Sequence, residues 1–296
     1  MRGTAKIALA AVAMLVATTG ASDAAFTGRN GRLAAVVGDG RVLLVSQDGM
    51  RVRQVAAGVT SAHWSADGNR VVLGLPCVRE GCNGNEGAPS GPGVLRVLNV
   101  RSGTSKRVRT SSPRMFQGPE APSWTPAGRL LWVQHVPVEA GSADVVVADR
   151  HGRHQRVVTP ASGMFSGFAR AAPVGGWIAV AVWSPARRLV VIPSRGGPER
   201  VLLVCDAPPC DVGTLDWSPD GTKLAVAGPA SMVRVIDVAS GAVQDVRQGS
   251  APFWSPDGRL LGSVSADGRI EIGPPTGGAV TTLPLRNVIS ADWQPR

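Results

Sequence analysis

The sequence predicts an all-β fold, a six-bladed β-propeller whose C-terminal strand closes the N-terminal blade. Three observations predict it. A short phrase recurs around a tryptophan, its copies are spaced at about the length of one propeller blade, and the first and last copies complete each other. Each unit of such a repeat buries its apolar surface only against its neighbours, so we expect the blades to form a continuous ring.

The recurring phrase is clearest at Trp217–Val226 and Trp254–Leu261, where Trp-Ser-Pro-Asp-Gly precedes an apolar run. Proline followed by aspartate and glycine is typical of a type I turn, and the apolar run predicts a strand that leaves a tight hairpin. The tryptophan ends the incoming strand, and its large ring is expected between two packed sheets. The structural tryptophans of the motif are Trp64, Trp124, Trp217, Trp254 and Trp293.

The copies begin at seven positions with intervals of 37 to 60 residues, namely Phe26, Trp64, Trp124, Ala171, Trp217, Trp254 and Trp293. Four strands with tight turns fill about 40 residues, so the longer intervals contain insertions. The first copy lacks the strand before its turn, and the last copy, Asn287–Trp293, contains only that strand. The last copy therefore completes the first, so seven copies give six closed blades. Closure of the ring removes exposed sheet edges. Seven blades are the alternative if the Trp64–Trp124 interval contains a degraded blade.

The first 24 residues are predicted to be a secretory signal peptide. Arg2 and Lys6 form a positive start, Ile7–Val16 is an apolar run, and Ser22-Asp23-Ala24 offers small residues for cleavage. The apolar run is too short for a stable membrane span. We therefore expect residues 25–296 to form a single exported propeller domain that is secreted or periplasmic and does not span the membrane.

The four cysteines form two close pairs, Cys77 with Cys82 and Cys205 with Cys210. In an exported chain, each pair predicts a local disulfide that stiffens a loop. A zinc site is the alternative, but it would need all four thiolates in one place. The two pairs belong to different blades and have no histidine beside them, which favours disulfides.

The chain is basic, with 31 Lys and Arg against 21 Asp and Glu and a net charge of +10. Without Arg2, Lys6 and Asp23 of the signal it keeps 29 basic and 20 acidic side chains, a net charge of +9. Such a protein could bind an anionic polymer of the cell envelope. The charges are dispersed along the chain, however, and a generally basic proteome explains them as well. Nucleic acid is not expected as a partner, because no binding motif is present and the protein is exported.

A binding face is predicted from the order of the strands. With strands A to D numbered from the axis outward, the tryptophan turn joins A to B, and the B–C and D–A connections emerge on the opposite face. Both cysteine pairs fall in such connections, and long connections on a rigid scaffold are typical of binding surfaces. The alternative is that they are tolerated insertions with their aromatic side chains tucked underneath. The candidate binding residues are Arg114, Phe116, Glu120, His135, Phe165, Phe168, Arg170, Trp183, Arg187 and Arg188.

No catalytic residue and no cofactor is predicted, because the sequence contains no nucleophile elbow, His-Glu-x-x-His helix, phosphate loop or dinucleotide fingerprint. His151 and His154 lie in a turn between strands, where a solvated turn is a simpler interpretation than a metal site. Asp216 and Asp292 each precede a motif tryptophan near the axis, where carboxylates could hold calcium. The equivalent positions in other blades form a poor oxygen cage, since they are His63, Ser123, Arg170 and Phe253.

The Trp-Ser-Pro-Asp-Gly units, followed by Leu-Ala-Val in the copy at Trp217, resemble the WD-repeat-like units of TolB-type six-bladed propellers. The resemblance covers essentially residues 26–296. It implies a propeller that docks partner proteins in the periplasm. TolB itself carries an additional N-terminal α/β domain, which has no counterpart in this sequence, so its particular partners are not implied.

These observations favour an exported, non-enzymatic propeller that binds a protein, a peptide or a cell-envelope polymer at the face of the B–C and D–A connections. The alternative is a metal-assisted hydrolase or lactonase with its site in the axial funnel, which requires at least three oxygen-bearing side chains around one ion. A purely structural envelope protein without a small ligand is a third hypothesis. Fold specifies function only weakly, so the site must decide among them.

Overall fold

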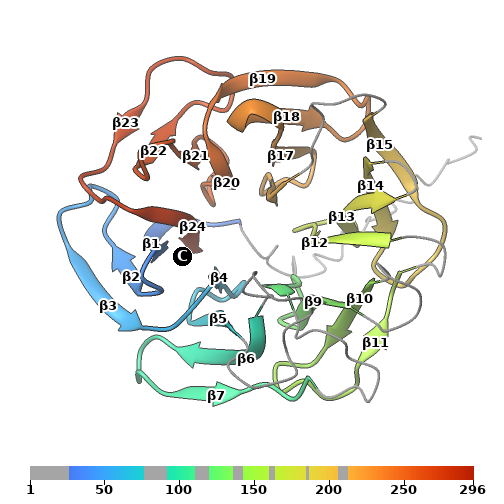
Figure 1. Ribbon diagram of the computed structural model, residues 1–296, viewed down its shortest axis with the longest axis horizontal. Helices are drawn as coiled ribbons and strands as arrows, with labels where there is room; N and C mark the ends of the chain where they lie inside the picture. Colours follow the sequence, from blue (N-terminus) through green and yellow to red (C-terminus); the bar gives the residue numbers. More distant parts are fainter. Residues whose placement is uncertain are drawn as a thin grey trace, which may run out of the picture.

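A computed structural model of the protein describes residues 27–76, 92–110, 120–135, 143–159, 164–184, 187–205 and 213–296. Within these ranges the chain forms six four-stranded antiparallel sheets that surround a central axis as blades (Figure 1). The predicted all-β fold and the predicted number of blades are therefore confirmed. The described part of the chain includes no helix with the length and apolar character that crossing a membrane requires.

In each of the first three blades the four strands follow one another from the axis outward. Blade 1 contains β24 (Val288–Pro295), β1 (Asn30–Val37), β2 (Val42–Val45) and β3 (Val52–Ala56). Blade 2 contains β4 (Ser61–Trp64), β5 (Arg70–Pro76), β6 (Pro92–Asn99) and β7 (Ser105–Arg107). Blade 3 contains β8 (Glu120–Trp124), β9 (Leu130–His135), β10 (Ala143–Ala148) and β11 (Arg156–Val157).

The remaining three blades follow the same order. Blade 4 contains β12 (Met164–Ala171), β13 (Trp177–Ser184), β14 (Arg187–Pro193) and β15 (Arg200–Cys205). Blade 5 contains β16 (Leu215–Trp217), β17 (Lys223–Ala227), β18 (Met232–Asp237), which follows the short 3-10 segment η1 (Pro229–Ser231), and β19 (Val243–Gln248). Blade 6 contains β20 (Ser250–Trp254), β21 (Leu261–Val264), β22 (Ile270–Gly273) and β23 (Thr281–Thr282).

The ring is closed by the two ends of the sequence. β24 pairs with β1 in an antiparallel ladder that places Trp293 opposite Leu33 and Asp292 opposite Ala34. The innermost strands β24, β4, β8, β12, β16 and β20 contact one another in that order, and β20 returns to β24. Blade 1 therefore combines the C-terminal strand with three strands from the start of the described chain, as the incomplete first and last copies predicted.

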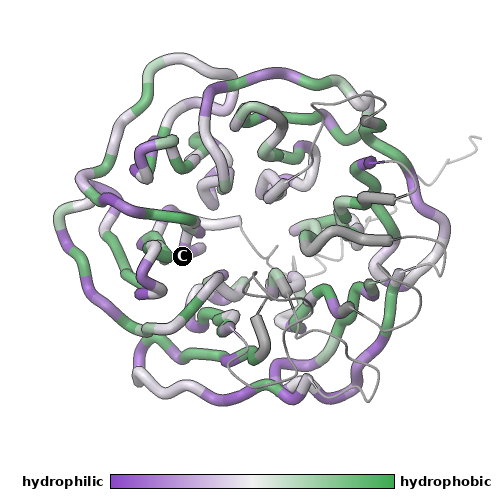
Figure 2. Tube along the Cα trace, in the orientation of Figure 1, coloured by the Kyte–Doolittle hydropathy of each residue, from purple (hydrophilic) through white to green (hydrophobic). Residues whose placement is uncertain are grey.

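The apolar core consists of six clusters, one between each pair of neighbouring blades. Strands B and C are packed on both faces, and β2 and β21 are buried at every residue. The outermost strands face water on the rim, as the exposed residues of β3 and β11 illustrate. Figure 2 accordingly shows hydrophobic residues concentrated on the inner strands and hydrophilic stretches along the outer ring.

The motif tryptophans lie in these clusters as expected, with exposed fractions of 5% or less, and they are Trp64, Trp124, Trp217, Trp254 and Trp293. In blade 6 the neighbouring Phe253 is also buried, and its ring lies 6.0 Å from that of Trp293. Gly262, which is paired with Phe253, makes room for this ring, because a Cβ there would lie 2.2 Å from the phenyl carbons.

The turn of the recurring phrase is held by its own side chains. The Ser218 hydroxyl donates to Asp220 at 2.6 Å, and the same carboxylate accepts the N–H of Thr222 at 3.0 Å. Gly221 adopts a φ of 69°, which is the left-handed conformation that glycine tolerates best. Burial alone would raise the pKa of Asp220, but these hydrogen bonds hold it below its usual value. The phrase is therefore a turn whose aspartate has a local structural role, as predicted.

The two faces of the ring differ in their connections. The turn face is the one with the A–B and C–D connections, and the loop face is the one with the B–C and D–A connections. β5 ends at Pro76, directly before Cys77, and β15 ends at Cys205, so both strands lead to the loop face. The predicted disulfides themselves involve residues outside the described ranges and stay predictions.

Candidate functional site

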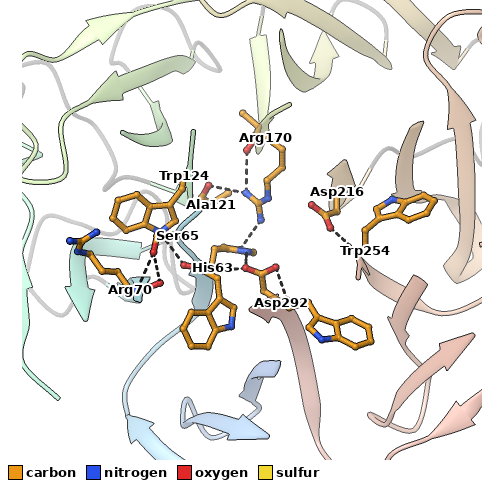
Figure 3. Close-up of polar contacts among 12 residues, drawn as sticks. His63, Ser65, Arg70, Ala121, Trp124, Arg170, Asp216, Trp254 and Asp292 are labelled. Atoms are coloured by element: carbon orange, nitrogen blue, oxygen red, sulfur yellow. Dashed lines mark hydrogen bonds and ion pairs between the residues drawn. The ribbon is translucent and has the colours of Figure 1, made fainter. Parts of the chain in front are cut away.

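The residue before each motif tryptophan, and before Ala171 at the equivalent position in blade 4, lies on an innermost strand next to the axis of the ring. These six positions hold His63, Ser123, Arg170, Asp216, Phe253 and Asp292. Four of them carry ionisable side chains that point toward one another from β4, β12, β16 and β24 (Figure 3). We call these four residues the axial cluster: His63, Arg170, Asp216 and Asp292.

Arg170 is the centre of the cluster's hydrogen bonds. Its guanidinium lies 2.7 Å from Nε2 of His63 and also donates to the carbonyl oxygens of Ala121 at 3.2 Å and Ala169 at 3.1 Å. A guanidinium can only donate, so Nε2 of His63 accepts and the proton of the neutral ring is on Nδ1. That nitrogen faces Asp292, whose Oδ2 is 3.6 Å away. The arrangement thus joins three blades through an arginine, a neutral histidine and a carboxylate.

The two carboxylates also join neighbouring blades through the backbone. Oδ2 of Asp292 accepts the N–H of Trp64 at 2.6 Å, and Oδ2 of Asp216 accepts the N–H of Trp254 at 2.8 Å. In each case the aspartate before one motif tryptophan bonds to the backbone of the next blade's motif tryptophan. These aspartates therefore have a structural role in addition to any role toward a ligand.

Burial shifts the pKa values of three side chains in the cluster. It raises the pKa of Asp216 to about 7, helped by the nearby carboxylate of Asp292 and opposed by the Trp254 hydrogen bond and Arg170. Burial likewise lowers the pKa of His63, and the positive charge of Arg170 adds to this effect. Burial also lowers the pKa of Arg170, although both carboxylates oppose the shift. The cluster therefore contains a carboxyl group that can gain or lose a proton near neutral pH.

The cluster is a poor site for a metal ion. Across the described ranges there is no group of three or more His, Cys, Asp and Glu side chains that could hold one. Ser123, at an equivalent position, is buried, and its hydroxyl has no hydrogen-bond partner there. Only two carboxylates reach the cluster, and an arginine shares the space with them, which disfavours a cation.

The structure places several predicted binding residues differently from the sequence analysis. The sequence predicts that these residues lie on long connections of one face, but β12 begins at Met164 and only residues 185–186 separate β13 from β14. Phe168 packs into the core between blades 4 and 5, and Arg170 lies in the axial cluster. Both residues belong to an inner strand because β12 pairs with β13 on both sides of a register shift between Phe165 and Ala169.

The other predicted binding residues are placed as follows. Arg188 forms an ion pair with Glu199 at 3.0 Å, and Arg187 is exposed at the start of β14 on the loop face. Four more belong to strand residues whose side chains are outside the described part, namely Glu120, His135, Phe165 and Trp183. Arg114 and Phe116 lie outside the described residues altogether, as do Cys77, Cys82 and Cys210.

From the sequence alone, the six axial positions are candidates only for oxygen ligands to calcium. The contact between His63 and Arg170 does not follow from the sequence, because it needs two strands from blades 2 and 4 to face each other. The sequence feature that could have indicated this contact is the occurrence of two acids, one arginine and one histidine at the same position of different repeat units. His151 and His154 lie in a turn of blade 3, with the His154 side chain 83% exposed, which fits the solvated turn.

Comparisons with known proteins identify the fold. No protein-family model and no curated protein sequence matches the chain. Among solved structures, TolB from Acinetobacter baumannii superposes with a TM-score of 0.68 at 18% identity, covering 90% of this chain and 67% of that one. A chain of a nidogen–laminin complex gives 0.67 at 11% identity, covering 89% and 98%. An oligogalacturonate lyase in complex with manganese gives 0.54 at 14% identity, covering 83% and 72%. The chain therefore shares its fold with TolB proteins.

Proposed function

We propose that the protein is an exported, non-enzymatic propeller that docks a protein or peptide partner on its loop face. The observation that carries this proposal is the unequal length of the connections on the two faces. On the turn face, all five A–B connections within the chain close in five or six residues. On the loop face, three connections are much longer: they span 77–91 in blade 2, 108–119 between blades 2 and 3, and 206–214 between blades 4 and 5, whereas others on this face are as short as residues 185–186.

The physical argument is that a closed ring of packed sheets is a rigid support, while connections on its surface are free to vary. Insertions confined to one face indicate that this face is the one adapted to a ligand. Arg187 is exposed there and Arg188 follows it, so an anionic polymer of the cell envelope is the alternative ligand. The shared fold of TolB and of a chain in a nidogen–laminin complex supports a binding scaffold.

A photo-crosslinking experiment tests the proposal. A benzophenone amino acid replaces Arg187 or Arg286, which are exposed on the loop face, and in matched controls Thr222 or Arg259 on the turn face. Each variant is irradiated in envelope extract with and without reductant, and crosslinked peptides are identified by mass spectrometry. We expect one recurring partner to crosslink from the loop-face positions only. Equal crosslinking from both faces, or crosslinking only from Thr222 and Arg259, would contradict the proposal.

The second candidate is an enzyme that acts at the axial cluster. Two observations favour it, namely the Asp216 carboxyl with a pKa of about 7 beside Arg170, and the shared fold with oligogalacturonate lyase. A group that titrates near neutral pH is suited to general acid–base catalysis. The described residues offer no metal-ligand group, so the metal-assisted form of this candidate has no support there. Turnover in a screen of esters, lactones and uronides that disappears in Asp216→Asn would favour the enzyme over the scaffold.

A further inference from the structure

A groove of about 780 Å³ lies on the turn face between blades 1 and 2. Its walls are the C–D turns of the two blades, its floor is formed by the ends of β24 and β1, and the A–B turn of blade 2 borders it. It lies on the opposite face from the proposed docking site. Its lining includes five arginines and one acidic side chain, namely Arg32, Arg51, Arg53, Arg101, Arg296 and Asp48.

The groove brings together several arginines that lack acidic partners. Within the described ranges, the guanidiniums of Arg32, Arg53 and Arg101 make no hydrogen bond or ion pair, and Arg51 has only the charge of Asp48 nearby. Some arginines elsewhere on the surface are each paired with an acid in their own blade, as in the pairs Arg41–Asp39, Arg70–Asp67, Arg234–Asp245 and Arg269–Asp267. The groove instead gathers five arginines around a single acidic side chain, so it is a local concentration of positive charge.

The floor of the groove is rigid. Gln294 donates to the carbonyl of Gly68 at 2.7 Å and accepts the N–H of Arg32 at 3.1 Å, so one side chain ties β24 to β1 and to the A–B turn of blade 2. Gly31 packs so closely on Gln294 that a Cβ there would lie 2.7 Å from its atoms, and at Gly68 a Cβ would lie 2.1 Å from a backbone oxygen. A floor fixed in this way holds the backbone at the base of the groove in place before a ligand arrives, so binding does not have to order this part of the chain.

We propose that this groove binds an acidic peptide segment of a partner protein. Guanidinium groups bind carboxylates through two parallel hydrogen bonds, which accounts for the preference for an acid. Among the arginines the lining also contains apolar surface, with Val52 49% exposed and Val100 beside it, and this suits the side chains of a peptide. A sugar or a base usually stacks on an aromatic ring, and the described lining includes no aromatic residue.

The test measures the fluorescence anisotropy of a labelled peptide of alternating Glu and Val residues. We expect the wild type to bind it, and binding to weaken at high salt because the contacts are ionic. The double substitution Arg53→Glu with Arg101→Glu should weaken binding at least about tenfold, since each contact to a charged group is worth more than about 1.4 kcal/mol. The matched control is Arg195→Glu with Arg259→Glu, which makes the same change of net charge on the same face away from the groove.

Four results would overturn the proposal. The first is that the wild-type protein does not bind the peptide. The second is an equal loss in both double variants, which would mean that net charge and not the groove attracts the peptide. The third is equal binding of a Gln–Val peptide, and the fourth is tighter binding of polygalacturonate or single-stranded DNA than of the Glu–Val peptide. A substitution to Gln at Arg53 and Arg101 repeats the test if the Glu variant unfolds, as judged by circular dichroism.

Discussion

At the scale of single residues, the axial positions show how one site in a repeat takes different chemical roles. Asp216 and Asp292 bond the backbone of the next blade, while Arg170 and His63 bond each other. Phe253 occupies the equivalent position with an apolar side chain, and its ring packs against that of Trp293. All these residues precede the same position of the repeat on an innermost strand, so the difference between them lies in the side chain.

Asp216→Asn should change how stability depends on pH. A carboxyl with a pKa raised from 3.8 to about 7 keeps its proton in the folded state where the unfolded chain has lost it. Folding stability therefore falls as pH rises through this window, and the full penalty is present above pH 7. An asparagine has no such penalty. We expect the melting temperature of the variant minus that of wild type to be larger at pH 8 than at pH 5 by at least about 2–4 °C. This difference corresponds to about 1 kcal/mol in the free energy of unfolding.

The matched control for this measurement is Asp220→Asn. The pKa of Asp220 is lowered, so this group is ionised in both states throughout the range. Its variant should keep a constant difference from wild type. If Asp216→Asn behaved in the same way, the interpretation of a carboxyl held protonated by burial would be wrong.

At the scale of the strands, each of the six blade interfaces is joined by a contact on the innermost strands, and these contacts are of four kinds. Aspartate bonds to a tryptophan N–H between blades 1 and 2 and between blades 5 and 6. A tryptophan indole donates to the preceding blade's carbonyl between blades 2 and 3 and between blades 4 and 5. Arg170 bonds Ala121 between blades 3 and 4, and Phe253 meets Trp293 between blades 6 and 1. The ring is therefore held by equivalent but not identical links.

Trp217→Phe should destabilise the protein more than Trp254→Phe, although the two residues occupy the same position of the repeat. Nε1 of Trp217 donates to the carbonyl of Arg170 at 3.0 Å, whereas Nε1 of Trp254 is buried without a partner in the described residues. Both variants lose similar apolar volume, but only the first loses a hydrogen bond, which is worth about 1 kcal/mol. Urea unfolding curves check this difference. Equal midpoints with equal slopes would contradict it.

At the scale of the whole molecule, closure by β24 removes the free edge of β1 and completes the cluster between blades 6 and 1. The same strand supplies Asp292 to the axial cluster and Gln294 to the floor of the arginine groove. The axial cluster and the groove with its five arginines therefore both depend on β24. A change that releases this segment should affect the ring and both sites together.

Removal of residues 287–296 should abolish the cooperative thermal transition, because it exposes the β1 edge and the apolar cluster around Leu33. A synthetic peptide of residues 287–296 should restore the transition in proportion to its concentration, since it binds only the folded ring. The control peptide carries Trp293→Ala and should restore it poorly. A truncated chain with the melting temperature of the full chain would show that closure contributes little.

Much of the fold could be predicted because the phrase is local. The Ser-Pro-Asp-Gly turn satisfies its own hydrogen bonds, as Asp220 illustrates, and its spacing sets the number of strands. The incomplete first and last copies also revealed which strands must pair. The boundaries of β12 and β13 could not be predicted, because the stretch around Phe168 has no turn phrase and its strand is fixed by pairing with a neighbour.

The sequence by itself determined the repeat, the turn chemistry, the six blades and the strand that closes them, because each depends on contacts within a unit or between its two ends. Only the tertiary structure decided that His63 and Arg170 meet near the axis and that four unrelated segments bring their arginines to one groove. These groupings arise from residues more than 100 positions apart or in different blades. Their contact depends on the curvature of the closed ring, which no local pattern specifies.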